Sequence, residues 1–337
     1  MRQLTLTDIG SVAWVEVAEP VLTGDGAAIV RPVAVAVCDF DRGLVSGRYT
    51  ALPYPIALGH EMVAEVVEVG SQVRTIAPGM QIVLPLHIFC GACASCGSGL
   101  TNSCLSRPPL SNYGLGSRGG DWGGGMSDLL AVPYADAMAV PLPPGLDKVA
   151  CAAVGCNMVD LYRTIAPYLA GRPDAEVLIV GGHAHNMALY GVAVARALGV
   201  SSVSFMDDHP ERLAAAEQLG ARPVQLGDRS RLYPIVVDCS GDTERVALAL
   251  SLVGPDGVCT PVWPYVGSAD LPIGAMFLRN ATLVTGQPHA RALMEPVLDL
   301  MQRTGLSSLF IPVEVLRWGE APEKFGAGEV KRIFVRD

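Results

Sequence analysis

The stretch EVLIVGGHAHNMA, residues 176–188, decides the fold of this chain. It begins with the apolar run Glu176–Val180, which has the length and the β-branched content of a short buried strand. Two glycines follow, and an apolar segment with helical periodicity, Met187–Leu198, comes after them. A buried strand, a glycine turn and a helix in this order predict a βαβ unit in a parallel sheet.

The same alternation of strands and helices extends from about residue 158 to residue 289. Helical patterns at Pro210–Leu219 and Thr243–Val253 separate further short apolar runs. Six strands with helices between them favour a doubly wound parallel sheet. The expected strands are Glu176–Val180, Ser202–Met206, Arg222–Leu226, Ile235–Ser240, Gly257–Trp263 and Ala281–Gly286.

The regions before and after this sheet have a different pattern. Residues 1–150 contain short apolar or alternating runs between Gly, Pro and Asp turns, which is typical of a β-rich domain. After about residue 288 come a predicted helix, Arg291–Thr304, and a β-like tail that ends with Lys331–Val335. The sequence therefore predicts an α/β protein with a second, β-rich domain. The β-rich runs are Ala27–Val37, Met62–Val69, Gln81–Leu86 and Ser127–Val132.

Length and charge limit the partners that this chain can have. Its 337 residues suggest about two domains, and half of them are hydrophobic. The net charge is −9 and there is no basic run, so nucleic acid and anionic membrane surfaces are poor partners. No apolar stretch reaches the roughly 18 residues of a membrane span, and the first residues have no apolar signal core. We therefore expect a cytoplasmic protein.

Four of the nine cysteines form a spaced cluster. Cys90, Cys93, Cys96 and Cys104 make a C-x2-C-x2-C-x7-C run. Because the cytoplasm keeps thiols reduced, such a cluster indicates metal binding rather than disulfides. Four thiolates predict a closed, structural zinc site that stabilises its own loop. An iron–sulfur cluster is the alternative, but the x7 spacing and the absence of a following proline weigh against it.

Several motifs occur together at the spacing of a known family. The cysteine cluster follows a Gly59-His60-Glu61 motif by about thirty residues, Cys38 and Asp41 make a Cys-x-x-Asp motif, and Cys156 lies downstream. In these features the chain resembles the zinc-containing medium-chain dehydrogenase/reductase family, the alcohol dehydrogenase-like group. The resemblance implies a GroES-like catalytic domain at residues 1–157 and 290–337. It also implies a Rossmann dinucleotide-binding domain at residues 158–289.

The resemblance further implies a second metal site. Cys38, His60 and Cys156 would be a Cys2His ligand set that leaves one position open, which is the mark of a catalytic zinc. Such a zinc polarises a substrate oxygen. Asp41 would accept the other ring N–H of His60, and Glu61 would be an occasional ligand. The alternative for each Cys or His is a packing role, which we expect for Cys151, Cys239 and Cys259.

The glycine loop departs from the G-x-G-x-x-G pattern of dinucleotide-binding folds. Gly181 and Gly182 are present, but His183 replaces the second glycine of the pattern and Ala188 the last, in a loop about two residues longer. Asp207 closes the next strand, where an acidic residue binds the ribose hydroxyls and disfavours a 2′-phosphate. We therefore predict that the chain binds NAD(H). The alternative is a Rossmann domain that has lost its cofactor.

The predicted catalytic loop lacks the family's proton carriers. Members usually have Ser or Thr two residues after the first cysteine ligand and often a histidine five residues after it, whereas this chain has Phe40 and Gly43. A step that moves an O–H proton in a dry site needs such a carrier. Asp160 could act as the missing acid or stabilise a cationic substrate; the alternative is a salt-bridged or helix-surface residue.

These features predict three functions of different kinds. The first is NAD(H)-linked interconversion of a small alcohol and its carbonyl compound. The second is reduction of an imine or a conjugated alkene, which needs no O–H proton carrier. The third is a non-enzymatic, zinc-stabilised binding protein. We also expect a homodimer or homotetramer formed through the last strands of the Rossmann sheet, at Gly257–Trp263.

Overall fold

The computed structural model describes residues 1–49, 52–172, 174–265 and 267–336. The chain divides into two compact units. The first comprises Met1–Val159, His289–Leu309 and Val313–Asp337, and the second comprises Asp160–Pro288 and Phe310–Pro312. Both combine sheets and helices, which confirms the α/β class. Within the described ranges, no helix has the length and apolar character of a membrane span.

The second unit is built on a six-stranded sheet in the order β11-β10-β9-β12-β13-β14. All neighbouring strands are parallel. The strand that comes first in the chain lies in the middle, and the order reverses beside it, which is the topology of a doubly wound dinucleotide-binding fold. The strands are β9 (Val177–Val180), β10 (Val203–Asp207), β11 (Arg222–Gln225), β12 (Tyr233–Asp238), β13 (Val253–Pro261) and β14 (Thr282–Leu283).

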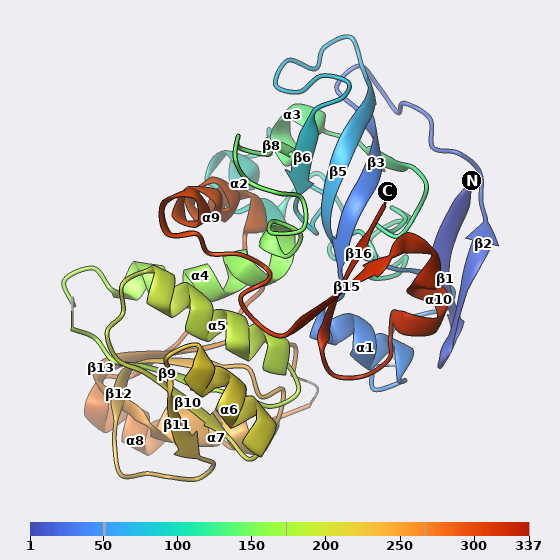
Figure 1. Ribbon diagram of the computed structural model, residues 1–337. Helices are drawn as coiled ribbons and strands as arrows, with labels where there is room; N and C mark the ends of the chain where they lie inside the picture. Colours follow the sequence, from blue (N-terminus) through green and yellow to red (C-terminus); the bar gives the residue numbers. More distant parts are fainter. Residues whose placement is uncertain (50–51, 173, 266, 337) are drawn as a thin grey trace. The chain divides into compact units, whose positions relative to one another are not determined.

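Helices cover both faces of this sheet because its central strands are apolar on both sides. All four residues of β9 are buried. Helix α5 packs against β9 and β10 and α6 against β10 and β11, whereas α7 contacts β12 and β13, and α8 contacts β13 (Figure 1). Right-handed crossovers place the two pairs on opposite faces. The helices are α4 (Val159–Ile165), η3 (Ala166–Tyr168), α5 (His185–Ala197), α6 (Pro210–Gln218), α7 (Thr243–Ser251) and α8 (Ile273–Arg279).

One edge of this sheet lies within the predicted strand Ala281–Gly286. The stretch Gly257–Trp263 falls largely in β13, which is paired on both sides, with β12 and β14. The edge strand is instead β14, which contains only Thr282 and Leu283. β14 pairs with only Val258 and Cys259 of this stretch, and a contact between chains through these last strands stays a prediction.

The first unit contains two sheets. The larger has the order β15-β16-β3-β5-β6-β8, with β7 also paired to β3, and the smaller has the order β2-β1-β4. The C-terminal strand β16 pairs with β3, so the end of the chain completes a sheet that the first half begins. The strands are β1 (Arg2–Asp8), β2 (Ser11–Glu16), β3 (Ala28–Ala36), β4 (Ile56–Ala57), β5 (Glu61–Val69), β6 (Gln81–Leu84), β7 (Leu130–Val132), β8 (Val140–Pro141), β15 (Val313–Arg317) and β16 (Lys331–Val335).

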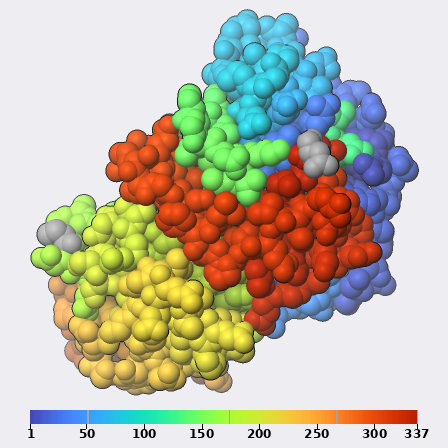
Figure 2. Space-filling model, in the orientation of Figure 1, coloured from blue at the N-terminus to red at the C-terminus, as the bar shows by residue number. Residues whose placement is uncertain are grey.

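Four short helical elements of the first unit, α1, α2, η1 and η2, contain or adjoin predicted metal-ligand cysteines. Helix α9 packs against the turns η1 and η2, which lie next to Cys104 and around Cys156. Figure 2 shows the C-terminal part of the chain on the surface of this unit. The elements are α1 (Asp39–Val45), α2 (Ala94–Gly97), η1 (Thr101–Ser103), α3 (Ala135–Met138), the π-helical η2 (Val154–Met158), α9 (Ala290–Thr304), η4 (Trp318–Glu320) and α10 (Ala321–Lys324).

A buried carboxyl group lies at the end of β12. Asp238 is fully buried, and its side chain accepts hydrogen bonds from the Tyr265 hydroxyl and, at 3.3 Å, from the Ser240 N–H. Burial raises the pKa of Asp238 to about 7, against the opposing hydrogen bonds of Ser240. An acid whose pKa is higher in the folded than in the unfolded chain destabilises the fold increasingly as the pH rises between those two values.

Replacing Asp238 by Asn should remove this pH dependence, because the amide keeps an acceptor for Tyr265 but cannot ionise. We expect the free energy of unfolding of Asp238→Asn, relative to the natural chain, to increase by about 2 to 3 kcal/mol between pH 5 and pH 8. Urea unfolding at several pH values measures this difference. A difference that stays constant over that range would show that Asp238 is ionised as easily in the folded chain as in the unfolded one.

Candidate active site and metal centres

The four clustered cysteines meet in one place. Their sulfur atoms all lie within 4.8 Å of one another, with Cys90 and Cys104 3.6 Å apart and Cys93 and Cys104 4.0 Å apart. A tetrahedral zinc with Zn–S bonds of about 2.3 Å requires sulfurs about 3.8 Å apart. The backbone N–H groups of Cys93 and Leu105 donate to the sulfurs of Cys90 and Cys93, at 3.3 and 3.4 Å. This donor set fits zinc.

The thiols of the cluster differ in pKa. Burial opposes ionisation of Cys90, but hydrogen bonds from Ser106 and from nearby backbone N–H groups lower the pKa of that thiol to about 6. Burial and the neighbouring Cys93 raise the pKa of Cys96 to about 12. A bound divalent cation would supply the positive charge that four thiolates at this distance need.

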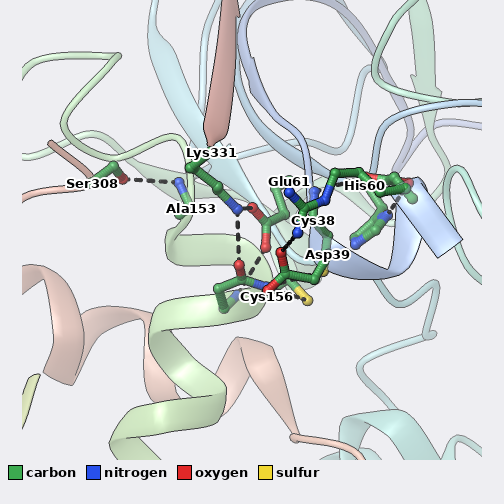
Figure 3. Close-up of polar contacts among 11 residues, drawn as sticks. Cys38, Asp39, His60, Glu61, Ala153, Cys156, Ser308 and Lys331 are labelled. Atoms are coloured by element: carbon green, nitrogen blue, oxygen red, sulfur yellow. Dashed lines mark hydrogen bonds and ion pairs between the residues drawn. The ribbon is translucent and has the colours of Figure 1, made fainter. Parts of the chain in front are cut away.

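The second set lies at the ends of three separate elements of the first unit. Cys38 precedes α1, His60 and Glu61 stand at the start of β5, and Cys156 lies in η2 (Figure 3). One ligand atom from each of the four lies within 4.8 Å of the others. The structure thus brings together the three predicted ligands and the predicted occasional one, and two thiolates with an imidazole suit zinc.

The backbone around Cys156 is shaped by its neighbour, Gly155. The segment forms a π-helical turn, a form often found at functional sites. A Cβ atom on Gly155 would lie 2.1 Å from the carbonyl oxygen of Leu84, so only glycine lets η2 approach the end of β6 this closely. The N–H of Ala153 also donates to Ser308 Oγ at 3.1 Å, which fastens the turn to the segment after α9.

Other glycines hold His60 in place. Gly59 has a φ of +90°, which glycine adopts without strain. A Cβ on Gly114 would lie 2.4 Å from the oxygen of Gly59, and one on Gly124 would lie 2.3 Å from the oxygen of Leu58. The loop that contains these glycines therefore packs directly on the backbone before His60 and fixes its course.

Asp41 contacts two members of the metal-ligand set, Cys38 and His60. Its Oδ2 accepts a hydrogen bond from the Cys38 N–H at 2.9 Å, and its Oδ1 makes a close polar contact with His60 Nδ1 at 3.2 Å. Burial alone would lower the pKa of His60, but the Asp41 carboxylate raises it well above its usual value. The hydrogen bond with Cys156 lowers the pKa of Cys38 well below its usual value, against the effect of burial. Orientation of the imidazole by Asp41 stays a prediction.

Two residues that the sequence analysis did not single out complete the site. Lys331 Nζ donates to Glu61 Oε2 at 2.7 Å and to Asn157 Oδ1 at 2.8 Å. The N–H of Asn157 donates to Glu61 Oε1 at 3.1 Å. Burial raises the pKa of Glu61 to about 7, against the opposing charge of Lys331. Both carboxylate oxygens of Glu61 therefore already accept hydrogen bonds from the protein.

The positions of the missing proton carriers are filled by aromatic rings. Phe40 stacks on Tyr49, with ring centroids 4.7 Å apart and an interplanar angle of 13°. A Cβ on Gly43 would lie 2.3 Å from the Tyr49 ring, so that ring uses the space a side chain would take. This apolar packing agrees with the absence of Ser or Thr at position 40.

Asp160 is paired within the second unit. It is buried, and its Oδ1 accepts from Arg163 Nε at 2.6 Å. Arg163 also donates to the carbonyl oxygen of Gly286 at 2.6 Å. This geometry matches the salt-bridged alternative considered for Asp160, and a catalytic role stays a prediction.

The glycine loop of the second unit has no room for side chains at two positions. A Cβ on Gly181 would lie 2.2 Å from Asp207 Oδ2, and one on Gly182 would lie 2.7 Å from the Cα of Ser240. His183 is exposed, whereas Ala188 is buried within α5. Only residues 181–184 connect β9 to α5, which is an ordinary length for such a connection. The expected lengthening of the loop is therefore wrong.

Asp207 offers an unused acceptor beside this loop. Its Oδ1 accepts from the N–H groups of Asp208 and His209, at 2.7 and 3.0 Å. Its Oδ2 is buried and accepts no hydrogen bond from the described residues. Arg212 Nη1 lies 3.9 Å from Oδ1, and burial raises the pKa of this carboxyl group. A buried acceptor at the end of β10 suits a ribose hydroxyl.

The tight approach at Gly155 gives a test of the metal-ligand geometry. Gly155→Ala would force η2 away from Leu84 and displace Cys156, so we expect the second metal site to be lost and the cysteine-cluster metal to remain. Metal analysis of the purified protein would then fall from about two zinc ions per chain to about one. The matched control is Gly97→Ala, since Gly97 has open space around its Cα. Two zinc ions in both variants would contradict the assignment.

Comparison with known proteins adds independent findings. The sequence pattern of the alcohol dehydrogenase GroES-like domain matches residues 24–144. The glutathione-independent formaldehyde dehydrogenase of Pseudomonas aeruginosa is 32% identical over 236 residues, which are 68% of this chain and 58% of that protein. The chain therefore spans less than two thirds of the length of this curated relative.

Two solved structures match along nearly the whole chain. The alcohol dehydrogenase TADH from Thermus sp. ATN1 is 27% identical with a TM-score of 0.91, and all of both chains is covered. A zinc-binding dehydrogenase from Sinorhizobium meliloti 1021, solved with NADP bound, is 25% identical with a TM-score of 0.79 and covers 99% of this chain and 98% of its own. With the two metal-ligand sets and the doubly wound sheet, these findings establish that the chain belongs to the zinc-containing medium-chain dehydrogenase/reductase family, the alcohol dehydrogenase-like group.

Proposed function

We propose that this chain is a zinc-dependent oxidoreductase that transfers hydride between a nicotinamide cofactor and a small alcohol or carbonyl substrate. The main support is the convergence of Cys38, His60 and Cys156, three ligands of the kind that hold a catalytic zinc with one position left for substrate. When bound, such a zinc polarises a substrate oxygen and makes a substrate hydroxyl more acidic. Glu61 is held by Lys331 and Asn157, which keeps its carboxylate occupied.

NAD(H) is the cofactor that we propose. Gly181 and Gly182 let the turn before α5 pack closely on Asp207 and Ser240, and a pyrophosphate would bind at the start of α5, where backbone N–H groups favour anions. The unused Oδ2 of Asp207 suits a ribose hydroxyl, and its carboxylate would repel a 2′-phosphate. The related dehydrogenase from Sinorhizobium meliloti was solved with NADP, so the choice between the two cofactors needs a direct measurement.

A second candidate reaction is reduction of an imine or a conjugated alkene. The stack of Phe40 on Tyr49 favours it, because it puts no hydroxyl at position 40, where relatives have their proton carrier. Reducing an iminium requires only hydride at carbon, and a conjugated alkene takes its later proton at carbon from solvent. Neither step requires transfer of an O–H proton inside the site.

Fluorescence titration of the zinc-loaded protein with NADH and NADPH tests the proposal. We expect NADH to bind at least about tenfold more tightly than NADPH, and Asp207→Asn to reduce that preference, because it removes the charge that repels a 2′-phosphate. Glu211→Gln, which removes an exposed charge from the first turn of α6, is the matched control and should keep the preference.

The outcomes separate the three functions. Saturable NADH binding followed by turnover of alcohols and ketones supports the first reaction. Turnover of cyclic imines or enals alone supports the second. No binding of either cofactor would contradict both and favour a zinc-stabilised binding protein.

We also propose that the chain assembles as a homodimer or homotetramer. Helix α8 presents three large apolar side chains to solvent, with Ile273, Phe277 and Leu278 exposed by 60%, 80% and 83%. The short edge strand β14 follows α8 directly. Contiguous exposed apolar patches are a mark of protein contacts, which supports an interface at α8.

Charge placed on α8 should therefore dissociate the assembly. We expect Phe277→Glu to reduce the molar mass in solution toward that of one 35.3 kDa chain, as measured by light scattering after gel filtration. Val21→Glu, at an apolar residue of the first unit that is 73% exposed, is the control and should leave the mass unchanged. An equal mass for the natural chain and Phe277→Glu would place the contact elsewhere or show a monomer.

A reducing, cytoplasmic location completes the proposal. None of the nine cysteines forms a disulfide, and all nine are metal-ligand or core cysteines that need to stay reduced. We propose a small molecule as the only partner besides further copies of the chain. The acidic net charge of −9 argues against nucleic acid and anionic membranes. The nine are Cys38, Cys90, Cys93, Cys96, Cys104, Cys151, Cys156, Cys239 and Cys259.

A further inference from the structure

The side chain of Asn157 touches both thiolates of the second metal-ligand set. Its Nδ2 lies 3.3 Å from Cys38 Sγ and 3.7 Å from Cys156 Sγ. Its Oδ1 accepts a hydrogen bond from Lys331 Nζ at 2.8 Å, and its backbone N–H donates to Glu61 Oε1 at 3.1 Å. Asn157 is fully buried, so these contacts are made without competition from water.

The partners of this amide allow only one orientation. An ammonium group has only hydrogen-bond donors, so Lys331 must face the amide oxygen. Thiolates accept hydrogen bonds, so the amide NH2 must face Cys38 and Cys156. Lys331 therefore does more than pair with Glu61, since it also holds the Asn157 amide with its donors toward the sulfurs.

Lys331 and Glu61 form a buried ion pair that supports this arrangement. Both side chains are inaccessible to solvent, and the Nζ–Oε2 distance is 2.7 Å. Such a pair is stable only when its remaining hydrogen-bonding groups are satisfied. Asn157 provides two of the contacts that satisfy it, one to each member.

We propose that Asn157 is a positioning residue that sets how strongly the two cysteine ligands donate charge to the bound metal, an inference that rests on zinc occupying this set. Hydrogen bonds to a thiolate stabilise charge on sulfur and reduce the charge it gives to a metal ion. A metal that receives less charge from its ligands polarises a substrate oxygen more strongly. At the same time the network occupies both oxygens of Glu61, so that the ligand position for substrate stays open.

A purely structural role is the competing explanation, because Asn157 belongs to the π-helical turn η2. The two roles predict different results for the sulfurs. If the side chain only supports the turn, its removal changes stability but leaves the electronic state of the thiolates as it was. If the amide acts on the sulfurs, its removal changes that state even where the turn is intact.

Cobalt(II) in the second site, with zinc in the cysteine cluster of the full chain, reports on the thiolates directly. We expect the thiolate-to-cobalt absorption band to move to longer wavelength in Asn157→Ala, because the sulfurs then give more charge to the metal. We also expect about ten- to a hundredfold weaker retention of the metal against a chelator. Asn157→Asp keeps an oxygen toward Lys331 but presents a second oxygen to the sulfurs, so it should retain the metal no better than Asn157→Ala.

Two further variants keep the test decisive. Ser308→Ala removes the hydrogen bond that holds Ala153 in the same turn without touching a sulfur, and should leave the band in place. Asn157→Ser keeps a donor of smaller size and should give an intermediate shift, which remains informative if Asn157→Ala does not fold.

The possible failures can be told apart. A cobalt band that is the same in the natural chain, Asn157→Ala and Asn157→Ser overturns the role of Asn157 and leaves the proposed function standing. Absence of any thiolate-to-cobalt band at this site in the natural chain would instead overturn the metal assignment on which the proposed function depends.

Discussion

The ion pair between Lys331 and Glu61 is the interaction on which the metal site of the first unit depends. Two charges removed entirely from water cost several kcal/mol each unless their geometry and hydrogen bonds compensate. Strand register provides that geometry, because Ala36 of β3 pairs with Glu61 of β5 on one side and with Ile333 of β16 on the other. Ala36 lies two positions before Cys38. Strand β16, which carries Lys331, is therefore aligned through Ala36 with Glu61 and with the start of the metal site.

This alignment explains why the C-terminal segment belongs to the first unit. Without β16 there would be no cation opposite Glu61, and a buried carboxylate beside two thiolates would be unpaired. Helix α9 reinforces the same region, since it packs against the turns η1 and η2. Residues of the C-terminal segment therefore hold Cys156 and the cysteine cluster in place.

The sequence was most informative where chemistry imposes a spacing. The fifteen residues from Cys90 to Cys104 bring four thiols together locally, so their pattern alone predicted the cluster. Cys38, His60 and Cys156 are far apart in the chain, and only their resemblance to a family placed them together. The pairing of Asp160 with Arg163 could have been expected from their i, i+3 spacing in a helix.

Other features depend on contacts that no local pattern contains. Lys331 begins the strand Lys331–Val335 next to a second basic residue, Arg332, which suggests a solvated side chain, yet it is buried by partners about 170 and 270 positions away. The role of Asn157 follows from that burial. The glycine loop was judged too long because Ala188 was taken as its end, whereas α5 already begins at His185. The last strand of this sheet was predicted at Ala281–Gly286, and the structure shortens it to the two residues of β14.

The charges around the second metal-ligand set also restrict the substrate. A zinc ion would balance the two thiolates of Cys38 and Cys156, Lys331 balances Glu61, and Arg42 balances Asp39. Asp41 then remains as an additional negative charge beside His60. A substrate that carries a carboxylate near its reacting carbon would need a cation, and both Lys331 and Arg42 are already paired. We therefore propose a neutral or cationic small molecule as substrate, such as a simple alcohol, aldehyde or iminium compound.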